Sequence, residues 1–412
     1  MKNILTVFAG RQHNIEILTK YLKKALELKI IDEVHFWNNT RNQNDEIYLE
    51  TISNVKRTSS SGYGRYIQLF TPIVNNIFSF NVIASNDIHI KILDNAQKDI
   101  EYEIVLGGWG NTISVIRKNN IEIVSLMKEN IADSIEENTF TVSIVNHSLN
   151  IYKNETVIVS CELTEKFNID DIFVKTGYNG VGHFNYKTIK NHDFYFMDTC
   201  EKNWQNYYTY YNDKKYIDDI IIKCDDDIVF IDLLKLPTFI EFIKNNDEYD
   251  LVFANIINNG VSAYFQQNKY NLIPYELMVL EYPHDGTCGT LWKSGSKAEL
   301  LHNYFISNYE KFLDYEYNND IIPIDTRFSI NFFGYKGSKW HKIIDAHNGD
   351  DEHNLTVEFV KHRDFKNIFY SDFYVSHLSF YKQIETNINI TDLVNKYNDL
   401  YDTIIQSGKF NI

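Results

Sequence analysis

The sequence predicts an α/β domain that is interrupted by an all-β sandwich. Strand and helix patterns alternate from residue 1 to about residue 55, and the same alternation returns after about residue 186. Between these parts the helical period disappears and short alternating runs replace it. We therefore expect a discontinuous α/β domain at residues 1–58 and 186–412, and an inserted β-sandwich at residues 59–185. The alternative is one large α+β domain with a long meander.

The first part of the chain predicts a strand, a helix and a second strand. Residues 4–8 form an apolar run, and residues 34–37 form another. The helix between them carries its apolar face on Leu18, Leu22, Ala25 and Leu26. This order is the opening of an α/β layer.

The last part of the chain continues the same alternation. Apolar runs at residues 219–224 and 251–255 predict strands. Pro237 is suited to the first position of a helix, and a further helix carries Ala298, Leu301 and Phe305. A C-terminal helix falls within residues 390–412, where we expect Thr391 as the N-terminal cap.

The middle part predicts antiparallel strands. Apolar and polar residues alternate at residues 78–82, 88–92 and 139–144, and Asn, Asp and Gly clusters separate such runs. This spacing is typical of a β-sandwich. A sandwich is readily inserted into another domain when its two ends lie close together at a surface loop of the host.

The tripeptide Asp225-Asp226-Asp227 directly follows the apolar run at residues 220–224. Three adjacent carboxylates repel one another, and at the end of a buried strand they need a cation or hydrogen-bond donors. Carboxylate oxygens are hard ligands that suit Mg²⁺ or Mn²⁺. The alternative is a solvated acidic turn that closes the strand.

Composition limits the class of partner. Of the 412 residues, 40 are Lys or Arg and 56 are Asp or Glu, which gives a net charge of −16. This balance disfavours a nucleic acid or an anionic membrane as the main partner. The apolar run at residues 4–9 is too short for a signal peptide, and no later run approaches the roughly 20 residues that a membrane span needs. We expect a cytoplasmic protein with no integral membrane segment.

The α/β part resembles a nucleotide-sugar-dependent glycosyltransferase of the GT-A type. The resemblance rests on the order of several short segments: residues 5–11, 37–45, 223–230, 325–329 and 375–381. It implies a nucleoside-diphosphate sugar as the donor, a glycan or another hydroxyl as the acceptor, and Mn²⁺ or Mg²⁺ as the cofactor. A metal that bridges the diphosphate oxygens stabilises the leaving group without a protonated acid.

The resemblance also assigns the site. Asp227 is expected to bind the metal directly, and Asp225 is expected to contact the ribose or to reach the metal through water. His377 completes the coordination in this scheme, although a lone His is as often structural. Ala9, Gly10 and Arg11 end the first strand, where open α/β sheets bind ligands, so with Asp225 and Asp226 they form the expected nucleotide site. Arg11 is suited to a phosphate or a base, and its alternative is an ordinary surface arginine.

An inverting reaction also needs a base for the acceptor hydroxyl. We expect Asp325 in this role, at the start of a helix that begins in residues 325–329. The alternative is that Asp325 only caps that helix. A second acidic cluster, Asp350-Asp351-Glu352, lies beside His347 and His353. We expect it to be a solvated loop, and the alternative is a site that binds acceptor or metal.

The middle part resembles the domain that is named after farnesoic acid O-methyltransferase. The resemblance rests on residues 78–90, 102–117 and 176–182. No strand, glycine-rich turn and helix suited to S-adenosylmethionine occurs in it, so we expect a binding or structural module, with glycans as one candidate ligand. The motif Gly107-Gly108-Trp109-Gly110 either shapes a β-bulge or corner, which we favour, or brings the backbone close to a ligand.

Two other functions remain open at this stage. The chain is either a non-catalytic carbohydrate-binding or scaffold protein built around the sandwich, or a metal-dependent phosphoesterase that uses the Asp triplet. A glycosyltransferase is stabilised by a nucleoside diphosphate together with Mn²⁺, a lectin by glycans without metal, and a phosphoesterase releases phosphate from simple esters.

Overall fold

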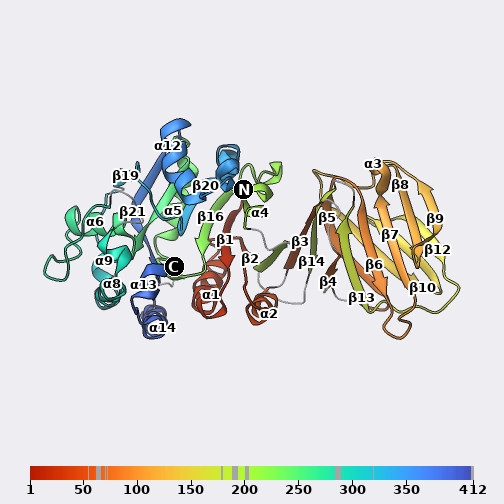
Figure 1. Ribbon diagram of the computed structural model, residues 1–412, viewed down its shortest axis with the longest axis horizontal. Helices are drawn as coiled ribbons and strands as arrows, with labels where there is room; N and C mark the ends of the chain where they lie inside the picture. The colour runs from red at the N-terminus through yellow and green to blue at the C-terminus, as the bar shows by residue number, and fades with distance from the viewer. Residues whose placement is uncertain are drawn as a thin grey trace. The chain divides into compact units, whose positions relative to one another are not determined.

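The computed structural model describes residues 1–53, 55–61, 66–69, 71, 73–177, 180–187, 194–199, 204–283, 289–318 and 320–409 (Figure 1). The chain forms two compact units. Unit 1 is Met1–Asp45 with Trp204–Ile412, and unit 2 is Glu46–Asn203. The predicted boundaries near residues 58 and 186 therefore fall inside strands β3 (Val55–Ser61) and β14 (Val181–Lys187) of unit 2.

Unit 1 contains a mixed β-sheet. Its strand order is β2-β1-β16-β20-β18-β21-β17, and β19 pairs with β21. The strand β1 is parallel to β2 and to β16, and β18 is parallel to β21, whereas the other pairs are antiparallel. The strands are β1 (Asn3–Ala9), β2 (Glu33–Asn38), β16 (Ile220–Asp225), β17 (Ile228–Ile231), β18 (Leu251–Ile257), β19 (Ile321–Pro323), β20 (Phe332–Lys336) and β21 (Asn367–His377).

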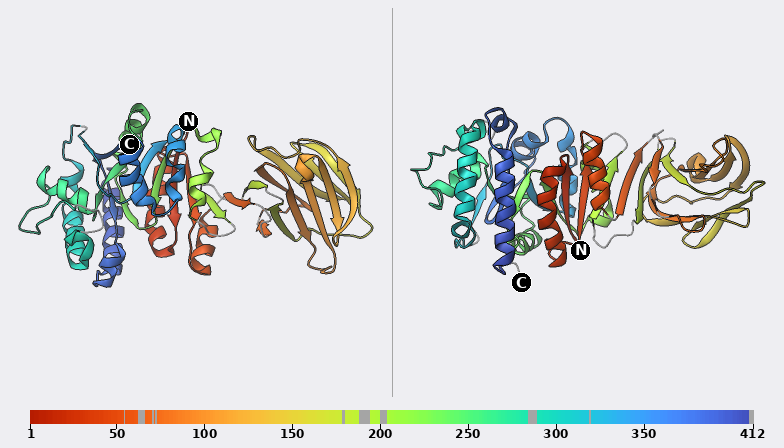
Figure 2. Two further views of the ribbon diagram at one scale, coloured as in Figure 1. Left: turned by 45° about the horizontal axis from the view of Figure 1, so that its top comes forward. Right: turned by 90° about the horizontal axis from the view of Figure 1, so that it is seen from below.

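Helices cover this sheet because its central strands are apolar on both faces. The helices α1 (Gln12–Glu27), α8 (Gly295–Ser307) and α14 (Ile390–Gln406) form one layer, in which α1 and α14 lie side by side and both contact β17 (Figure 2). The helix α5 (Leu236–Asn245) packs over β16, β20 and β21. The other helices of unit 1 are α4 (Asn206–Tyr210), α6 (Gly260–Asn268), α7 (Thr290–Lys293), α9 (Tyr309–Leu313), α10 (Trp340–Ile343), α11 (Asp351–His353), α12 (Phe359–His362) and α13 (Tyr381–Glu385), and α2 (Gln43–Ile52) crosses the unit boundary.

The helices of unit 1 that apolar spacing and Pro237 predict are present, with one correction at a cap. Leu18, Leu22 and Ala25 are buried on α1, and α5 has its proline in the first turn. The cap of α14 is Asn389, whose side chain accepts a hydrogen bond from the backbone N–H of Asp392 at 3.2 Å. The expectation that Thr391 caps this helix is therefore wrong, because Thr391 already lies within it.

Unit 2 is a sandwich of two sheets, as the sequence predicts. One sheet has the order β12-β11-β10-β5-β14-β3-β15 and the other has the order β4-β13-β6-β7-β8-β9. Their pairs are antiparallel except that β15 is parallel to β3. The remaining elements are β4 (Ile67–Leu69), β5 (Ile77–Ala84), β6 (Ile88–Leu93), β7 (Glu101–Gly107), α3 (Gly108–Asn111), β8 (Ile113–Lys118), β9 (Ile121–Met127), β10 (Asn138–Val145), β11 (Ser148–Lys153), β12 (Thr156–Glu162), β13 (Asp171–Thr176) and β15 (Phe194–Thr199).

The two sheets of unit 2 share one apolar core. Phe80 and Phe140 face it from one sheet, and Ile90, Ile104 and Val174 face it from the other. The alternation seen in the sequence is the reason, because every second residue of a strand points to the same face. Within the described residues, none of the helices has the length and apolar composition needed to cross a bilayer.

A buried carboxylic acid lies between β17 and α5. The Oδ1 atom of Asp232 accepts hydrogen bonds from the backbone N–H groups of Leu234 at 3.1 Å and Lys235 at 3.3 Å. Its Oδ2 atom is buried and has no hydrogen-bond partner among the described residues. Burial favours the neutral acid and raises the pKa of Asp232 to about 7.

This shift predicts a pH dependence of stability. Between about pH 4 and pH 7 the folded state keeps a proton that the unfolded state releases, so the contribution of Asp232 to stability falls as the pH rises through this window. The free energy of unfolding of Asp232→Asn, measured with denaturant, should therefore rise relative to that of the wild type between pH 4 and pH 8, by on the order of a few kcal/mol. The exposed Asp218 provides a control, and Asp218→Asn should show no such trend. A difference between Asp232→Asn and the wild type that is constant with pH would contradict the assignment.

Candidate functional site

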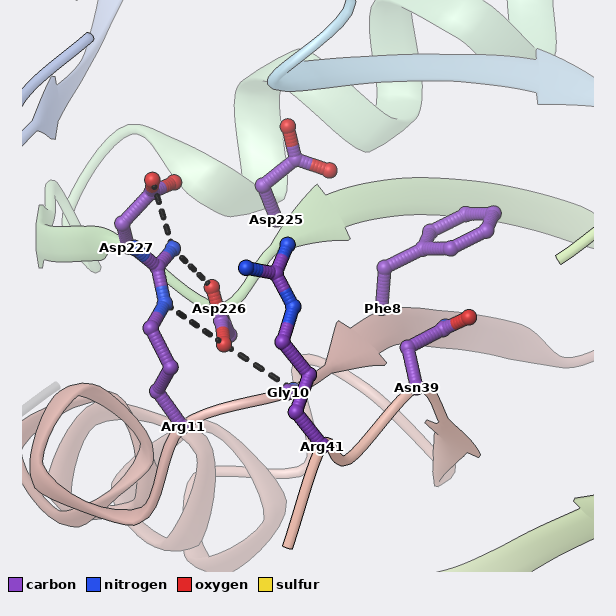
Figure 3. Close-up of a pocket in the computed structure, with 8 residues that line it drawn as sticks. All are labelled: Phe8, Gly10, Arg11, Asn39, Arg41, Asp225, Asp226 and Asp227. Carbon is purple, nitrogen blue, oxygen red and sulfur yellow. Dashed lines mark hydrogen bonds and ion pairs between the residues drawn. The ribbon is translucent and has the colours of Figure 1, made fainter. Parts of the chain in front are cut away.

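A cavity of about 240 Å³ opens at the edge of the unit 1 sheet where β1 and β16 end (Figure 3). It lies here because β2, β1 and β16 are parallel neighbours, so their carboxyl ends reach the same edge. The residues that line it are Phe8, Gly10, Arg11, Asn39, Arg41, Asp225, Asp226 and Asp227. The predicted nucleotide-site residues Gly10, Arg11, Asp225 and Asp226 are thus brought together.

Gly10 allows the chain to pass close to the Asp triplet. Its backbone N–H donates a hydrogen bond of 2.9 Å to Oδ2 of Asp226. A Cβ atom at this position would lie 3.2 Å from the same oxygen and 3.4 Å from the carbonyl oxygen of Asn39. Contacts this short would require the neighbouring atoms to move, so a glycine at position 10 best allows the chain to pass this close to Asp226. Ala9 does not line the cavity; it is buried within β1, and its carbonyl accepts a hydrogen bond from the N–H of Asn39.

Arg11 bridges two of the three aspartates. Its Nη2 atom lies 2.6 Å from Oδ1 of Asp226 and 2.9 Å from Oδ2 of Asp227, and its Nε atom lies 3.3 Å from Oδ2 of Asp226. Burial alone would lower the pKa of Arg11, but the two carboxylates outweigh burial and raise it. Arg11 is therefore a permanent cation that neutralises the site, and the alternative of an ordinary surface arginine is wrong.

His377 and Asp227 face each other at the end of β21. Ile228 is paired with His377, and the backbone N–H of Leu378 donates to the carbonyl of Asp227 at 2.8 Å. The Nε2 atom of His377 is 3.3 Å from Oδ1 of Asp227, and both side chains are almost fully buried. Although burial favours the neutral acid, the charges of His377 and Arg11 hold the pKa of Asp227 well below its usual range.

Asp225 is directed away from this pair. Its carboxylate forms an ion pair with Lys223, and its Oδ2 atom accepts a hydrogen bond of 2.8 Å from Nδ2 of Asn331. Lys223 also donates to the carbonyl of Ile330 at 2.6 Å, which fixes the ammonium group in place. Within the described ranges, no group of three or more His, Cys, Asp and Glu side chains is arranged to hold a metal. Asp225 and Asp227 therefore do not form a joint ligand set in this structure.

Asp227 and His377 nevertheless fit a divalent cation with two protein ligands. The Oδ1 atom of Asp227 is buried and has no hydrogen-bond partner among the described residues, and it is faced by the Nε2 atom of His377. Two adjacent ligands of a cation with bonds of about 2.1 Å are about 3 Å apart, close to the separation between Nε2 and Oδ1. Mg²⁺ commonly takes only one or two protein ligands and completes its shell with water and substrate phosphates.

The structure corrects the expectation for Asp325. No helix begins at residues 325–329, which form an irregular segment between β19 and β20. Asp325 is exposed and does not line the cavity, and it caps no helix. Arg327 of this segment forms ion pairs with residues 350–352, with Nε 2.6 Å from Oε1 of Glu352 and Nη2 2.8 Å from Oδ2 of Asp350.

The acidic cluster at residues 350–352 is also more ordered than the sequence suggests. Asp351 and Glu352 are half-buried, and the buried hydroxyl of Tyr208 donates to Oδ2 of Asp351 at 3.0 Å. Burial raises the pKa of Asp351, although the charge of Lys223 opposes this shift. The expectation of a solvated loop is therefore wrong for these two residues.

Sequence reasoning missed three residues of the cavity wall: Phe8, Asn39 and Arg41. Asn39 and Arg41 directly follow β2, and β2 is parallel to β1. The parallel order of β1 and β2 could have predicted Asn39 and Arg41 as cavity residues, because the residues that follow neighbouring parallel strands meet at one edge of the sheet. Arg41 is exposed and points into the cavity beside Gly10 (Figure 3), and no ion pair to it is formed within the described part of the chain.

Comparisons with known proteins concern unit 2. Residues 60–189 match the family model described as "Farnesoic acid 0-methyl transferase", so the chain contains a domain of this type, as its sequence predicts. No curated protein matches the chain.

Solved structures with a similar fold cover about a third of the chain. A beta-glucanase of Bacillus licheniformis is 9% identical over 31% of this chain and 69% of that chain, with a TM-score of 0.23. The carbohydrate binding module CBM66 of Bacillus subtilis is 6% identical over 32% and 93%, with a TM-score of 0.22. The galectin LEC-6 of Caenorhabditis elegans is 9% identical over 31% and 94%, with a TM-score of 0.22. Scores at this level support no conclusion about ligand or activity.

The bridging role of Arg11 can be tested by stability. Arg11→Met keeps the apolar stem but leaves two buried carboxylates without their main cation. We expect a loss of about 2–3 kcal/mol in the free energy of unfolding, at the low end for a buried pair because Arg11 is partly exposed. The control Arg41→Met should stay within about 0.5 kcal/mol of the wild type. Because a cation can replace the guanidinium, Mn²⁺ should restore part of the loss, and a variant as stable as the wild type without metal would contradict the role.

Proposed function

We propose that unit 1 is a metal-dependent glycosyltransferase of the GT-A type, which transfers a sugar from a nucleoside-diphosphate sugar to a glycan or another hydroxyl acceptor. The observation that carries the proposal is the buried Oδ1 atom of the cavity residue Asp227, which has no hydrogen-bond partner among the described residues and lies 3.3 Å from Nε2 of His377. A carboxylate oxygen and an imidazole nitrogen in this arrangement suit Mn²⁺ or Mg²⁺. When bound, the metal would neutralise charge on the diphosphate as the sugar leaves.

The charges around the cavity support a diphosphate ligand. Arg11 and the N–H of Gly10 already neutralise Asp226, so this carboxylate does not repel an incoming anion. Arg41 supplies a further guanidinium at the cavity wall, and guanidinium groups pair well with phosphate oxygens. Asp225, at the end of β16, keeps the proposed contact to the ribose, and Lys223 with Asn331 fixes its orientation.

Asp325 remains the proposed base for the acceptor hydroxyl. The residue is exposed on the irregular segment between β19 and β20, so an acceptor could reach it. A carboxylate that takes the hydroxyl proton makes the acceptor oxygen a better nucleophile. The acceptor itself is proposed only as a hydroxyl compound.

Thermal unfolding with nucleotides tests the proposed activity. We expect the full chain to be stabilised by one of UDP, GDP, CDP or dTDP together with Mn²⁺, and by neither component to the same extent alone, because the metal links the nucleotide to Asp227 and His377. Stabilisation by glycans without metal would favour the carbohydrate-binding alternative. Release of phosphate from simple esters would favour the phosphoesterase.

A substitution of Asp227 tests the proposed metal site most directly. Asp227→Asn keeps the shape of the side chain but removes the charge that would hold the cation, so the joint shift with nucleotide and Mn²⁺ should disappear and transfer should fall by at least about 100-fold. The exposed Asp247 supplies a control, and Asp247→Asn should leave both readouts unchanged. Retained transfer in Asp227→Asn would remove this residue from the mechanism.

Asp325 is tested separately from the donor site. Asp325→Asn should lower the rate of transfer by about 100-fold or more, since general-base catalysis typically contributes this much, while the thermal shift with nucleotide and Mn²⁺ persists. The exposed Asp314, which directly follows α9, supplies a control, and Asp314→Asn should leave the rate of transfer unchanged. Unchanged turnover in Asp325→Asn would show that another group, or none, acts as the base.

A further inference from the structure

Trp109 lies in α3, which forms the turn between β7 and β8 of unit 2; Figure 1 labels this turn. Trp109 is 53% exposed, although tryptophan is usually among the better buried residues. Its backbone is in the left-handed region with φ 49°, and it is flanked by Gly107 and Gly110, which also have positive φ. Only unusual support keeps a bulky residue in this conformation, and such positions often occur at functional sites.

Hydrogen bonds fix the backbone below the indole ring. The side chain of Asn111 donates to the carbonyl of Ala132 at 2.8 Å and accepts from its N–H at 2.9 Å. The hydroxyl of Thr112 donates to the carbonyl of Trp109 at 2.7 Å. A Cβ atom on Gly107 would lie 2.4 Å from Oδ1 of Asn111, so glycine is required for this turn. The glycines therefore have the structural role that the sequence favours, and the turn they build presents an aromatic ring to solvent.

A polar network lies on the same sheet. Glu103 of β7 points away from the core and accepts from Nδ1 of His89 on β6 at 2.9 Å and from Nη1 of Arg117 on β8 at 2.7 Å. The hydroxyl of Tyr66, just before β4, donates to it as well. The Glu103 side chain is only 10% exposed. Groups from three strands or strand ends thus hold this carboxylate in one orientation.

Arg117 joins the tryptophan to the network. Its guanidinium carbon lies 6.0 Å from the centre of the Trp109 ring, and the same side chain binds Glu103. Only one of its five N–H donors is needed for the bond from Nη1 to Glu103, so others can serve a ligand. A flat apolar ring and a set of fixed donors and acceptors therefore lie next to each other.

The charges on this face almost cancel. Lys91 pairs with Glu101 at 3.0 Å, and Lys91 and Lys175 also lie 4.8 and 4.5 Å from the ring centre of Tyr66. With Arg117 there are three cations against the three carboxylates Glu101, Glu103 and Asp171, which point to the same face of the sheet. A polyanion would gain little from such a surface, whereas a neutral ligand rich in hydroxyl groups would not be repelled.

We propose that this face of unit 2 binds a neutral oligosaccharide, with Trp109 stacked on the apolar face of one sugar ring and with Glu103 and Arg117 bonded to its hydroxyl groups. A pyranose ring presents C–H groups on one face and hydroxyl groups around its rim. The indole ring of Trp109 suits the C–H face of the sugar. The charged groups of Glu103 and Arg117 suit its hydroxyl groups, because hydrogen bonds that involve a charged group are stronger than neutral ones. The site is independent of the proposed transfer reaction, since none of its residues belongs to unit 1.

Binding of the full chain to a printed array of neutral and anionic oligosaccharides tests the proposal. The wild type should bind at least one neutral oligosaccharide. Trp109→Ala should weaken that binding about tenfold or more, and Trp109→Phe, which keeps a ring, should weaken it less. Glu103→Gln should also weaken binding about tenfold. Val157→Ala removes an equally exposed side chain from β12 of the other sheet and should change nothing.

Each other outcome overturns the proposal. No binding to any oligosaccharide by the wild type would favour a protein partner, for which the exposed Ile121 and Met127 of the neighbouring strand β9 offer apolar contacts. Binding only to anionic oligosaccharides, lost at high salt, would mark an anion site. Equal binding by Trp109→Ala would place the site elsewhere. Asp227→Asn should bind the array like the wild type, so failure of the transfer proposal and failure of this one are separable.

Discussion

Repulsion among three successive aspartates is the constraint around which the unit 1 site is arranged. The chain provides each carboxylate with its own source of positive charge. Asp225 pairs with Lys223 of the same strand, Asp226 with Arg11 from the end of β1, and Asp227 with Arg11 and with His377 from the end of β21. Three separate parts of the sequence must therefore meet before the end of β16 becomes stable, and the cavity is the space left between them.

This arrangement separates two kinds of carboxylate. Asp225 and Asp226 have most of their oxygen atoms bonded to Lys223, Asn331, Arg11 or Gly10. Asp227 keeps one oxygen that only the imidazole of His377 approaches. An unsatisfied buried carboxylate oxygen costs free energy in the folded protein, and a cation would relieve that cost. Burial thus singles out one aspartate of a triplet that the sequence presents as three equal candidates.

Periodicity predicted the fold well because it reports burial directly. The helix face of α1 and the alternating strands of unit 2 follow from which side of each element meets a core. It could not find residues whose role depends on a distant partner. Thr391 has a good capping side chain, but the backbone leaves the helical path two residues earlier, at Asn389. Asp325 has a side chain typical of a helix start, but residues 325–329 form an irregular segment, and no local pattern shows the ion pairs of its Arg327 with residues 350–352. The position of Arg41 at the cavity follows from the parallel pairing of β1 and β2, which the local sequence does not show.

The parallel pairing of β1 with β16 has a consequence for biosynthesis. Each strand of this pair lies more than 200 positions from the other, as the hydrogen bond of Lys2 to Asp219 across 217 positions illustrates. At about 5–20 residues per second, a ribosome needs roughly 10–40 s to supply the second strand after the first. During this interval the whole of unit 2 emerges and can fold, while the apolar β1 has no partner on its β16 side. The nascent chain is therefore most exposed to aggregation before its last half is made, and a chaperone that holds the first 45 residues would act at that stage.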